Sequence, residues 1–259
     1  MELLTVDIQK AQSCLGISDL PYETVSNSNR FDTYPWHDQS SRQRPQIYRF
    51  SQNFSQWSCL IFETFAGSSQ LERLKYCTGS TPILAIALDG SGFYGQHQRI
   101  WQTGLGNLYL SAYIPMNWLK TKLPQSIIDN THCLFEVLQK IPCMAVLKAL
   151  EQTLTYKPDY IPGIKHPNDI VVKTKGRNYK LAGCLTEITM QQDKIQSVRM
   201  GIGLNIDHAP LLTTDTEYEA ICCKDICIND HSDLYTQILR LIALNLITID
   251  KETIESALC

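Results

Sequence analysis

Lysine and glycine residues suited to hold an anionic ligand are concentrated between Lys165 and Asp207. The sequence there reads K-H-P-N-D-I from Lys165, K-L-A-G from Lys180 and G-I-G-L-N from Gly201. A lysine on a strand close to a glycine can reach a carboxylate or phosphate oxygen, while the glycine lets the backbone approach the same ligand closely. The stretch therefore predicts a site for a carboxylate or a phosphate.

Length and composition indicate a folded protein with one domain of α/β size plus an appendage. The chain has 259 residues, of which 44% are hydrophobic and 19% are charged, so it can bury a sizeable core. The formal net charge is -3 and the pI is about 6.1, which gives no bulk attraction for nucleic acid or an anionic membrane. An anionic ligand must therefore be held by a few local groups.

The cysteines and the first ten residues indicate in which cellular compartment the protein is expected. The 10 cysteines include no C-x-x-C pair, which is typical of reduced, mostly buried thiols. Met1–Lys10 lacks the basic and apolar segments of a signal peptide, and no uninterrupted apolar run approaches the length of a membrane span. We expect a soluble cytoplasmic protein with neither a nucleic acid nor a membrane as partner.

The spacing of apolar residues predicts an α+β domain. Residues 26–45 are rich in Ser, Asn, Gln and Pro, so we expect residues 1–46 to form an N-terminal arm or extension and residues 47–259 the domain. Expected strands are Ser58–Thr64, Pro82–Leu88, Asn107–Pro115, Tyr160–Ile164, Ile170–Lys173, Ala182–Thr189 and Ser197–Asn205. Expected helices are Ser68–Tyr76, Thr131–Leu154 with a break or kink at Pro142, and Leu234–Leu246. Hairpin-linked strands with a few helices predict a mixed, mostly antiparallel sheet covered by helices.

The linked motifs resemble the catalytic core of biotin-protein ligases, in the biotin/lipoate-protein ligase superfamily. The family pattern is K-W-P-N-D-[IL], then K-[LI]-[AG]-G-[IL]-x-x-E, then G-[IVA]-G-[IL]-N, and Glu187 falls in the place of that glutamate. Upstream, the segment from Gly106 to Ser111 is similar to the family's G-x-N-L-Y-x-S strand, and Trp101 to the tryptophan before it. The resemblance extends from Ser58 to Asp230 and implies a ligase-like fold.

The resemblance implies ATP-dependent chemistry in two steps. Biotin and ATP give biotinyl-AMP and pyrophosphate, with Mg²⁺ on the triphosphate, and biotin then passes to a lysine in the biotin-carrier domain of a carboxylase. The implied catalytic residues are Lys180, which would bridge biotin and phosphate, Lys165 and Arg99. The implied biotin-binding residues are Ser68, Ser69, Gly90, Gly92, Gly95, Lys180, Gly183 and Gly201. The implied ATP- or adenylate-binding residues are Arg99, Trp101, Asn168, Asp169, Cys184, Gly203 and Asn205, with Asp169 also a Mg²⁺ ligand.

The family's signature loop, G-R-G-R-x-G-R-x-W, has lost most of its arginines here. Matching the glycines places Ser91, Phe93 and Gln96 at the arginine positions, with an insertion before the tryptophan. Counting back from the tryptophan without a gap keeps Arg99 and places Tyr94 at the first arginine. Under both alignments the first arginine is missing, and Arg99 is the one guanidinium of the loop that can pair with a phosphate. We therefore expect weaker binding of biotin and its adenylate than a full arginine set would give.

The sequence departs from the family pattern in other places, and these departures limit the functions we expect. His166 replaces the usual tryptophan and is expected to be partly buried. We expect no small β-rich C-terminal domain after the Leu234–Leu246 helix and no helix-turn-helix in Met1–Pro45, so no repressor function. Cys222, Cys223 and Cys227 with His231 fit no common zinc spacing. A homodimer is left open.

Three functions are compatible with these residues. The first is a short, non-repressor biotin-protein ligase. The second is a relative that ligates or transfers lipoate or octanoate, in which Cys184 would need an activating partner to act as a nucleophile. The third is a binding or regulatory protein that keeps the fold without adenylation, suggested by the missing loop arginines.

Overall fold

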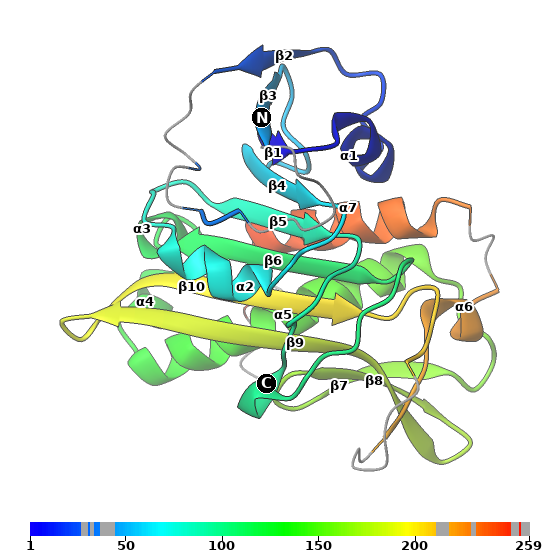
Figure 1. The fold of residues 1–259 in the computed structure, drawn as a ribbon. Coiled ribbons are helices and arrows are strands. Elements are labelled where there is room, and N and C mark those ends of the chain that lie inside the picture. Colours follow the sequence, from blue (N-terminus) through cyan, green and yellow to red (C-terminus); the bar gives the residue numbers. More distant parts are fainter. Residues whose placement is uncertain are drawn as a thin grey trace.

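The computed structural model describes residues 1–26, 31, 34–36, 45–210, 218–228, 232–249 and 254. One 11-stranded sheet has the order β2-β3-β1-β4-β5-β6-β10-β9-β8-β7, and β11 pairs with β9 outside this path (Figure 1). Its strands are β1 (Glu2–Thr5), β2 (Tyr22–Val25), β3 (Gln46–Phe50), β4 (Cys59–Glu63), β5 (Ile83–Ala87), β6 (Leu108–Pro115), β7 (Ile161–Lys165), β8 (Asp169–Thr174), β9 (Arg177–Gln191), β10 (Lys194–Leu204) and β11 (Glu219–Ala220). Three pairs are parallel, β1 with β4, β4 with β5 and β11 with β9. The other pairs are antiparallel, which confirms a mixed, mostly antiparallel sheet.

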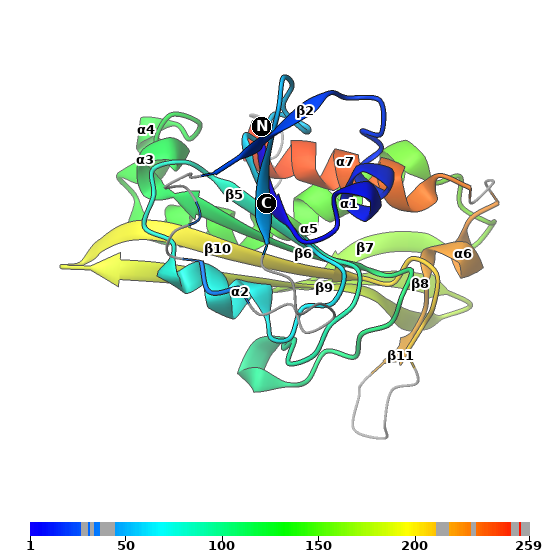
Figure 2. The same cartoon turned by 45° about the horizontal axis from the view of Figure 1, so that its top comes forward.

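Helices cover the two faces of the sheet unequally. The α-helices are α1 (Ile8–Leu15), α2 (Gln70–Arg73), α3 (Met116–Leu119), α4 (Gln125–Ile128), α5 (Thr131–Thr153), α6 (Cys223–Ile226) and α7 (Leu234–Thr248). The long helices α5 and α7 pack together on one face, whereas α2 lies on the opposite face (Figure 2). The main core lies between the sheet and the α5–α7 pair and contains residues such as Leu138, Ile141, Leu239 and Ile242. No helix in the described ranges is long and apolar enough to cross a membrane.

The start of the chain is part of the sheet, and the expected arm over residues 1–46 is corrected for its described residues. β1 lies between β3 and β4, and β2 extends the sheet beyond β3. Leu3 of β1 and Leu15 of α1 are fully buried in the main core. The prediction missed this unit because β1 and β2 have four residues each and show little periodicity. Much of the polar segment 26–45 lies outside the described residues.

Helix α5 runs through Pro142 without a break. Proline has no amide hydrogen, so the carbonyl of Leu138, four residues earlier, loses its helical donor. Thr186 of β9 supplies a replacement, because its Oγ1 donates to the Leu138 oxygen at 3.2 Å. The sheet thus satisfies the polar group that the proline leaves, and the expected break is absent.

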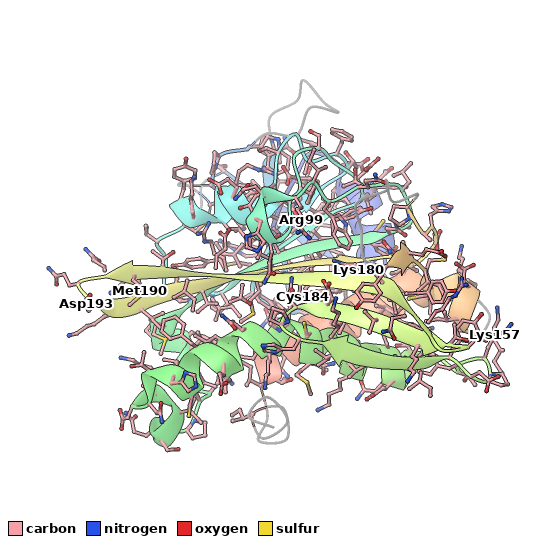
Figure 3. All side chains as sticks on the ribbon, turned by 90° about the horizontal axis from the view of Figure 1, so that it is seen from below. Arg99, Lys157, Lys180, Cys184, Met190 and Asp193 are labelled. Carbon is pink, nitrogen blue, oxygen red and sulfur yellow. The ribbon has the colours of Figure 1, made fainter. Side chains whose placement is uncertain are left out.

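Strands β9 and β10 form the longest hairpin and carry the site. Ten residue pairs link them, from Lys194 opposite Gln191 to Leu204 opposite Ala182. Their tip, with Met190 and Asp193, projects well beyond the body of the protein, whereas Arg99, Lys180 and Cys184 lie near the middle of the sheet (Figure 3). The motif-bearing ends of these strands therefore meet the loop that follows β5.

Candidate active site

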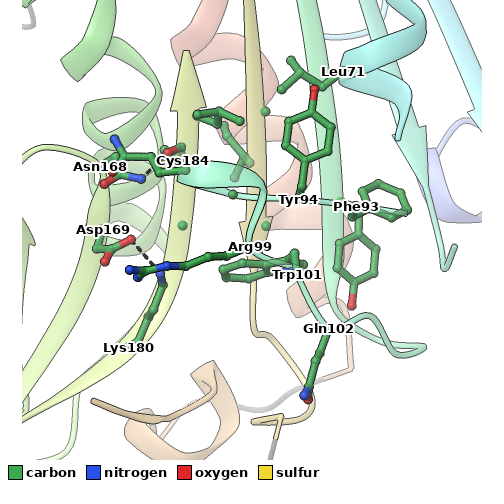
Figure 4. A pocket seen from close by; sticks show the side chains of 18 of the residues that line it. Leu71, Phe93, Tyr94, Arg99, Trp101, Gln102, Asn168, Asp169, Lys180 and Cys184 are labelled. Carbon is green, nitrogen blue, oxygen red and sulfur yellow. Dashed lines mark hydrogen bonds and ion pairs between the residues drawn. The ribbon is translucent and has the colours of Figure 1, made fainter. Parts of the chain in front are cut away.

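A pocket of about 380 Å³ lies between the sheet and the glycine loop, which we define as residues 89–106 (Figure 4). Most residues singled out from the sequence line it: Ser69, Gly95, Arg99, Trp101, Lys165, Asn168, Asp169, Lys180, Gly183, Cys184, Gly201, Gly203 and Asn205. Ser68, Gly90 and Gly92 do not line it. An ideal Cβ on Gly90 would lie 2.6 Å from the Ala66 carbonyl oxygen, so Gly90 allows two chain segments to approach closely rather than facing a ligand.

The floor of the pocket is a pair of glycines on neighbouring strands. Gly183 of β9 and Gly203 of β10 lie directly opposite each other. The indole of Trp101 covers both, since an added Cβ would lie 2.7 Å from its Cζ3 at Gly183 and 2.5 Å from its Cε2 at Gly203. Only glycine at these two positions lets the indole lie flat against the sheet.

A register shift in β9 explains the K-L-A-G spacing. Val171 pairs with Lys180 and Ile170 with Ala182, so Leu181 is an extra residue in the ladder. Without a shift, residues 180 and 183 would point to opposite faces of the sheet. With it, Leu181 and Ala182 are both buried, and an ideal Cβ on Gly183 lies 3.5 Å from Lys180 Cε. The bulge brings the lysine and the glycine to the same face, above the pocket.

Three cations and one carboxylate converge on this floor. Lys180 Nζ lies 2.8 Å from Asp169 Oδ1 and 5.4 Å from the centroid of the Trp101 ring. Lys165 Nζ lies 4.0 Å from the ring centroid of Tyr218. The guanidinium of Arg99 reaches from the glycine loop toward Lys180 and Asp169 (Figure 4). Because Asp169 is the one carboxylate among the described residues of the pocket lining, this region carries excess positive charge.

The asparagine side chains of the site make hydrogen bonds mainly to backbone groups around the pocket. Asn168 Nδ2 donates to the Cys184 carbonyl at 2.8 Å, which ties the turn between β7 and β8 to β9. Asn205 is buried and donates to the Ile221 carbonyl at 3.2 Å. Asn107 Oδ1, which the sequence motif contained without a role, accepts from the amides of residues 206, 207 and 208 at 3.0–3.1 Å. These three hydrogen bonds to Asn107 fix the chain where it leaves β10, beside the pocket.

The glycine loop is held by its own contacts. Its tip is a small hairpin in which Gly95 N donates to Arg99 O at 2.8 Å and Trp101 N donates to Phe93 O at 2.9 Å. Ser91 Oγ donates to the Gly67 carbonyl at 3.1 Å, and Thr103 Oγ1 to the Gly90 carbonyl at 2.6 Å. Among the residues that replace the family's arginines, Ser91 is exposed, binds the Gly67 carbonyl with its hydroxyl and does not line the pocket.

Tyr94 connects the loop to two other elements. Its hydroxyl donates toward Glu72 Oε2 of α2 at 3.0 Å and toward Glu187 Oε1 of β9 at 3.1 Å. Glu187 is also paired with Arg199 of β10 at 3.0 Å, and Arg199 donates to the Leu71 carbonyl at 3.1 Å. Burial first, and then Glu187, raises the pKa of Tyr94 to about 12. The sequence motif contained Glu187 but gave no sign of these partners.

The cysteines do not form a nucleophile or a metal site in the described part of the chain. Cys184 lies against Cys143, and that contact together with burial raises the pKa of Cys184 well above its usual value, so the thiol stays protonated. No group of three metal-capable side chains occurs among the described residues. Cys222, Cys223 and Cys227 are free thiols, and His231 lies outside the described residues. His166, expected to be partly buried, is exposed beside the pocket.

Comparison with known proteins supports this architecture. The chain is 27% identical over 154 residues to the bifunctional ligase/repressor BirA of Bacillus subtilis strain 168, which covers 58% of this chain and 41% of BirA. The BirA of Bacillus spizizenii is 26% identical over 151 residues. The chain thus spans less than half the length of these curated relatives. No family model matches it.

Solved structures share the arrangement of elements. Biotin protein ligase from Leishmania major, in complex with biotinyl-5-AMP, has a TM-score of 0.53 at 20% identity. The superposition covers 76% of this chain and 78% of the Leishmania chain. Biotin protein ligase from Aquifex aeolicus, in complex with biotin and ATP, has a TM-score of 0.52 at 20% identity and covers 77% and 75%. Sheet, helices and pocket define an α+β domain with a basic pocket on one face of the sheet. More specifically, the chain has the biotin-protein ligase catalytic-domain fold.

Proposed function

We propose that this protein is an ATP-dependent biotin-protein ligase that forms biotinyl-AMP and transfers biotin to a lysine of a carrier protein. The observation that carries the proposal is the convergence of Lys180, Lys165 and Arg99 on the Gly183–Gly203 floor. The Leishmania ligase in complex with biotinyl-5-AMP and the Aquifex ligase in complex with biotin and ATP support the choice of ligands.

The pocket offers suitable surroundings for each part of such a ligand. Leu71 lies over Gly201, Leu185 of β9 stands opposite Gly201 in the ladder and also lines the pocket, and Ser69 and Ser111 add hydroxyls to this otherwise apolar end. A ring with an apolar body and a few polar edges fits that composition. At the other end, the indole of Trp101 gives an aromatic surface for a nucleobase.

Lys180 has the central role in the proposed first step. Attack of the biotin carboxylate on the α-phosphate forms a carboxyl–phosphate bond and breaks the bond to pyrophosphate, and negative charge builds up on the phosphate oxygens. The ammonium of Lys180 would stabilise this charge, and Arg99 could pair two phosphate oxygens with its planar fork. Asp169, at 2.8 Å, holds the Lys180 ammonium in place before the ligand arrives.

The residues present fit a Mg²⁺ ion that enters with the nucleotide. Mg²⁺ in nucleotide sites is commonly held by one or two carboxylates, substrate phosphates and water. Asp169 would supply the carboxylate, through Oδ2, since Oδ1 is paired with Lys180. When bound, the ion would neutralise charge on the triphosphate.

Exchange of labelled pyrophosphate into ATP tests the proposal. Exchange that depends on biotin, and not on lipoate or octanoate, is the expected result. Transfer of biotin to a biotin-carrier domain then tests the second step. We expect both steps to take place in the cytoplasm. Exchange with lipoate or octanoate alone would move the protein to the other branch of the superfamily.

The alternative is a protein that binds biotin or its adenylate without making it. Arg99 is the one arginine of the glycine loop, so the phosphate has fewer charged contacts than the family motif would supply. Tight binding of biotin with no exchange would favour this alternative.

A further inference from the structure

We propose that Tyr94 is a positioning residue that latches the glycine loop closed over the pocket, a function that replaces charged anchors of the loop. The inference rests on the proposed function for its consequence, retention of the adenylate, but the latch itself can be tested without any ligand.

The latch joins three elements through one side chain. Tyr94 projects from the loop, Glu72 belongs to α2 and Glu187 to β9, and the hydroxyl lies 3.0 and 3.1 Å from their carboxylates. Arg199 completes the contact, since it pairs with Glu187 at 3.0 Å and donates to the Leu71 carbonyl of α2 at 3.1 Å. The Tyr94 hydroxyl therefore lies within hydrogen-bond distance of both walls of the pocket, α2 through Glu72 and β9 through Glu187.

The position of the latch decides what it controls. Tyr94 and Leu71 lie together at one end of the pocket, away from Lys180 and Gln102 (Figure 4). The Leu71 side chain in turn lies over Gly201, where an ideal Cβ would be 3.2 Å from its Cδ2. The Tyr94 contact thus closes the end of the pocket where the apolar part of biotin would lie. It also keeps Arg99 and Trp101 over the glycine floor.

The two acceptors make the latch tolerant of single losses. A hydroxyl has one proton and donates to one carboxylate at a time, so either glutamate can hold the loop. Glu72 is also paired with Lys75, and Glu187 with Arg199. Loss of Glu72 should therefore weaken closure less than loss of the hydroxyl, which removes both contacts.

The first arm of the test uses ligand-free protein. Hydrogen exchange measured by mass spectrometry on the peptide covering residues 91–101 should be about tenfold faster in Tyr94→Phe than in the wild type, as expected for loss of one hydrogen bond to a charged group. Glu72→Ala should lie between the two. Tyr22→Phe, an exposed tyrosine on β2, is the matched control and should exchange like the wild type. Equal exchange in Tyr94→Phe and wild type overturns the latch, whatever the function of the protein.

The second arm measures retention. A non-hydrolysable biotinyl-AMP analogue should dissociate about tenfold faster from Tyr94→Phe, on the same hydrogen-bond argument, and the KM for biotin should rise with little change in kcat. A fall in kcat alone would instead place Tyr94 in the chemical step and contradict a positioning role. If the wild type binds neither biotin nor the analogue, the proposed function fails, while the hydrogen-exchange arm still decides the latch.

Discussion

Replacement of Lys180 by alanine removes the cation that the structure places at the centre of the pocket. The substitution takes an ammonium away from the floor formed by Gly183 and Gly203 and leaves the backbone of β9 unchanged. The Lys180 side chain is 28% exposed and Asp169 is 19% exposed, so the pair is partly screened by solvent. Its loss should lower the free energy of unfolding by only about 1 kcal/mol. The melting temperature should fall by about 2–4 °C for a chain of this size.

The effect on adenylation should be much larger. A unit charge about 4 Å from a phosphate oxygen is worth roughly 4 kcal/mol at an effective dielectric constant near 20. Removal of one preorganised donor to a developing oxyanion typically costs about 2.7–4 kcal/mol. We therefore expect biotin-dependent pyrophosphate exchange to fall by roughly 10²–10³-fold in Lys180→Ala.

The matched control is Lys173→Ala, an exposed lysine on β8 that does not line the pocket. It should retain full exchange activity. Exchange in Lys180→Ala within about twofold of the wild type, in a variant that remains folded, would refute the role given to Lys180, since even a small share of the expected loss exceeds that range.

Further predictions concern the indole, the arginine and the tyrosine. Gly203→Ala should displace Trp101, because the new Cβ would lie 2.5 Å from Cε2. Calorimetry should show that the adenylate analogue binds at least about tenfold more weakly, as for loss of an aromatic stacking surface. Gly163→Ala, where a Cβ meets nothing within 4 Å, should bind the analogue normally. Arg99→Lys keeps the charge and loses the planar fork, so exchange activity should fall by about tenfold; unchanged exchange would mean that Arg99 does not pair with the phosphate. Because the pKa of Tyr94 is raised from 10.0 to about 12, the stability that its protonated hydroxyl contributes is present below pH 10.0 and is lost as the pH rises through about 12. The absorbance titration of the wild type minus that of Tyr94→Phe should therefore show a tyrosine with a midpoint near 12, and a midpoint near 10.0 would contradict the buried hydrogen bond.

The motifs of the sequence located the pocket because their spacing reflects the geometry of the sheet. Lys180 and Gly183 share a face only because Leu181 is bulged, and Gly203 stands opposite Gly183 in the ladder. Such residues are constrained by close backbone approach, so a pattern of types and distances along the chain is enough to find them. Strands β4 to β10 and the long helices were predicted for a different reason, because their apolar residues are regularly spaced over many positions.

Other parts depend on contacts that no local pattern records. Tyr94 meets Glu187 across 93 positions of the chain, and the sequence gives no sign of that pairing. Tyr218 lies in a polar segment, and only the folded chain brings its ring to Lys165. The N-terminal strands were missed because a strand of four residues is stabilised by its neighbours in the sheet more than by its own propensity. Gly90 and Gly92 lie at the start of the glycine loop and approach Ala66 and Ser68, so these two glycines and Ser68 do not line the pocket although the motif implied ligand contacts.

Detection of the product tests most directly whether this pocket joins biotin to the α-phosphate of ATP. Purified protein is mixed with biotin, ATP and Mg²⁺, quenched with acid, and analysed by mass spectrometry for biotinyl-AMP, with Lys180→Ala and Lys173→Ala treated in parallel. We expect about one equivalent of biotinyl-AMP per wild-type or Lys173→Ala molecule, as for an intermediate that the active site retains, and little in Lys180→Ala. Wild-type protein that binds biotin and ATP and yields no biotinyl-AMP would contradict the proposed ligase activity.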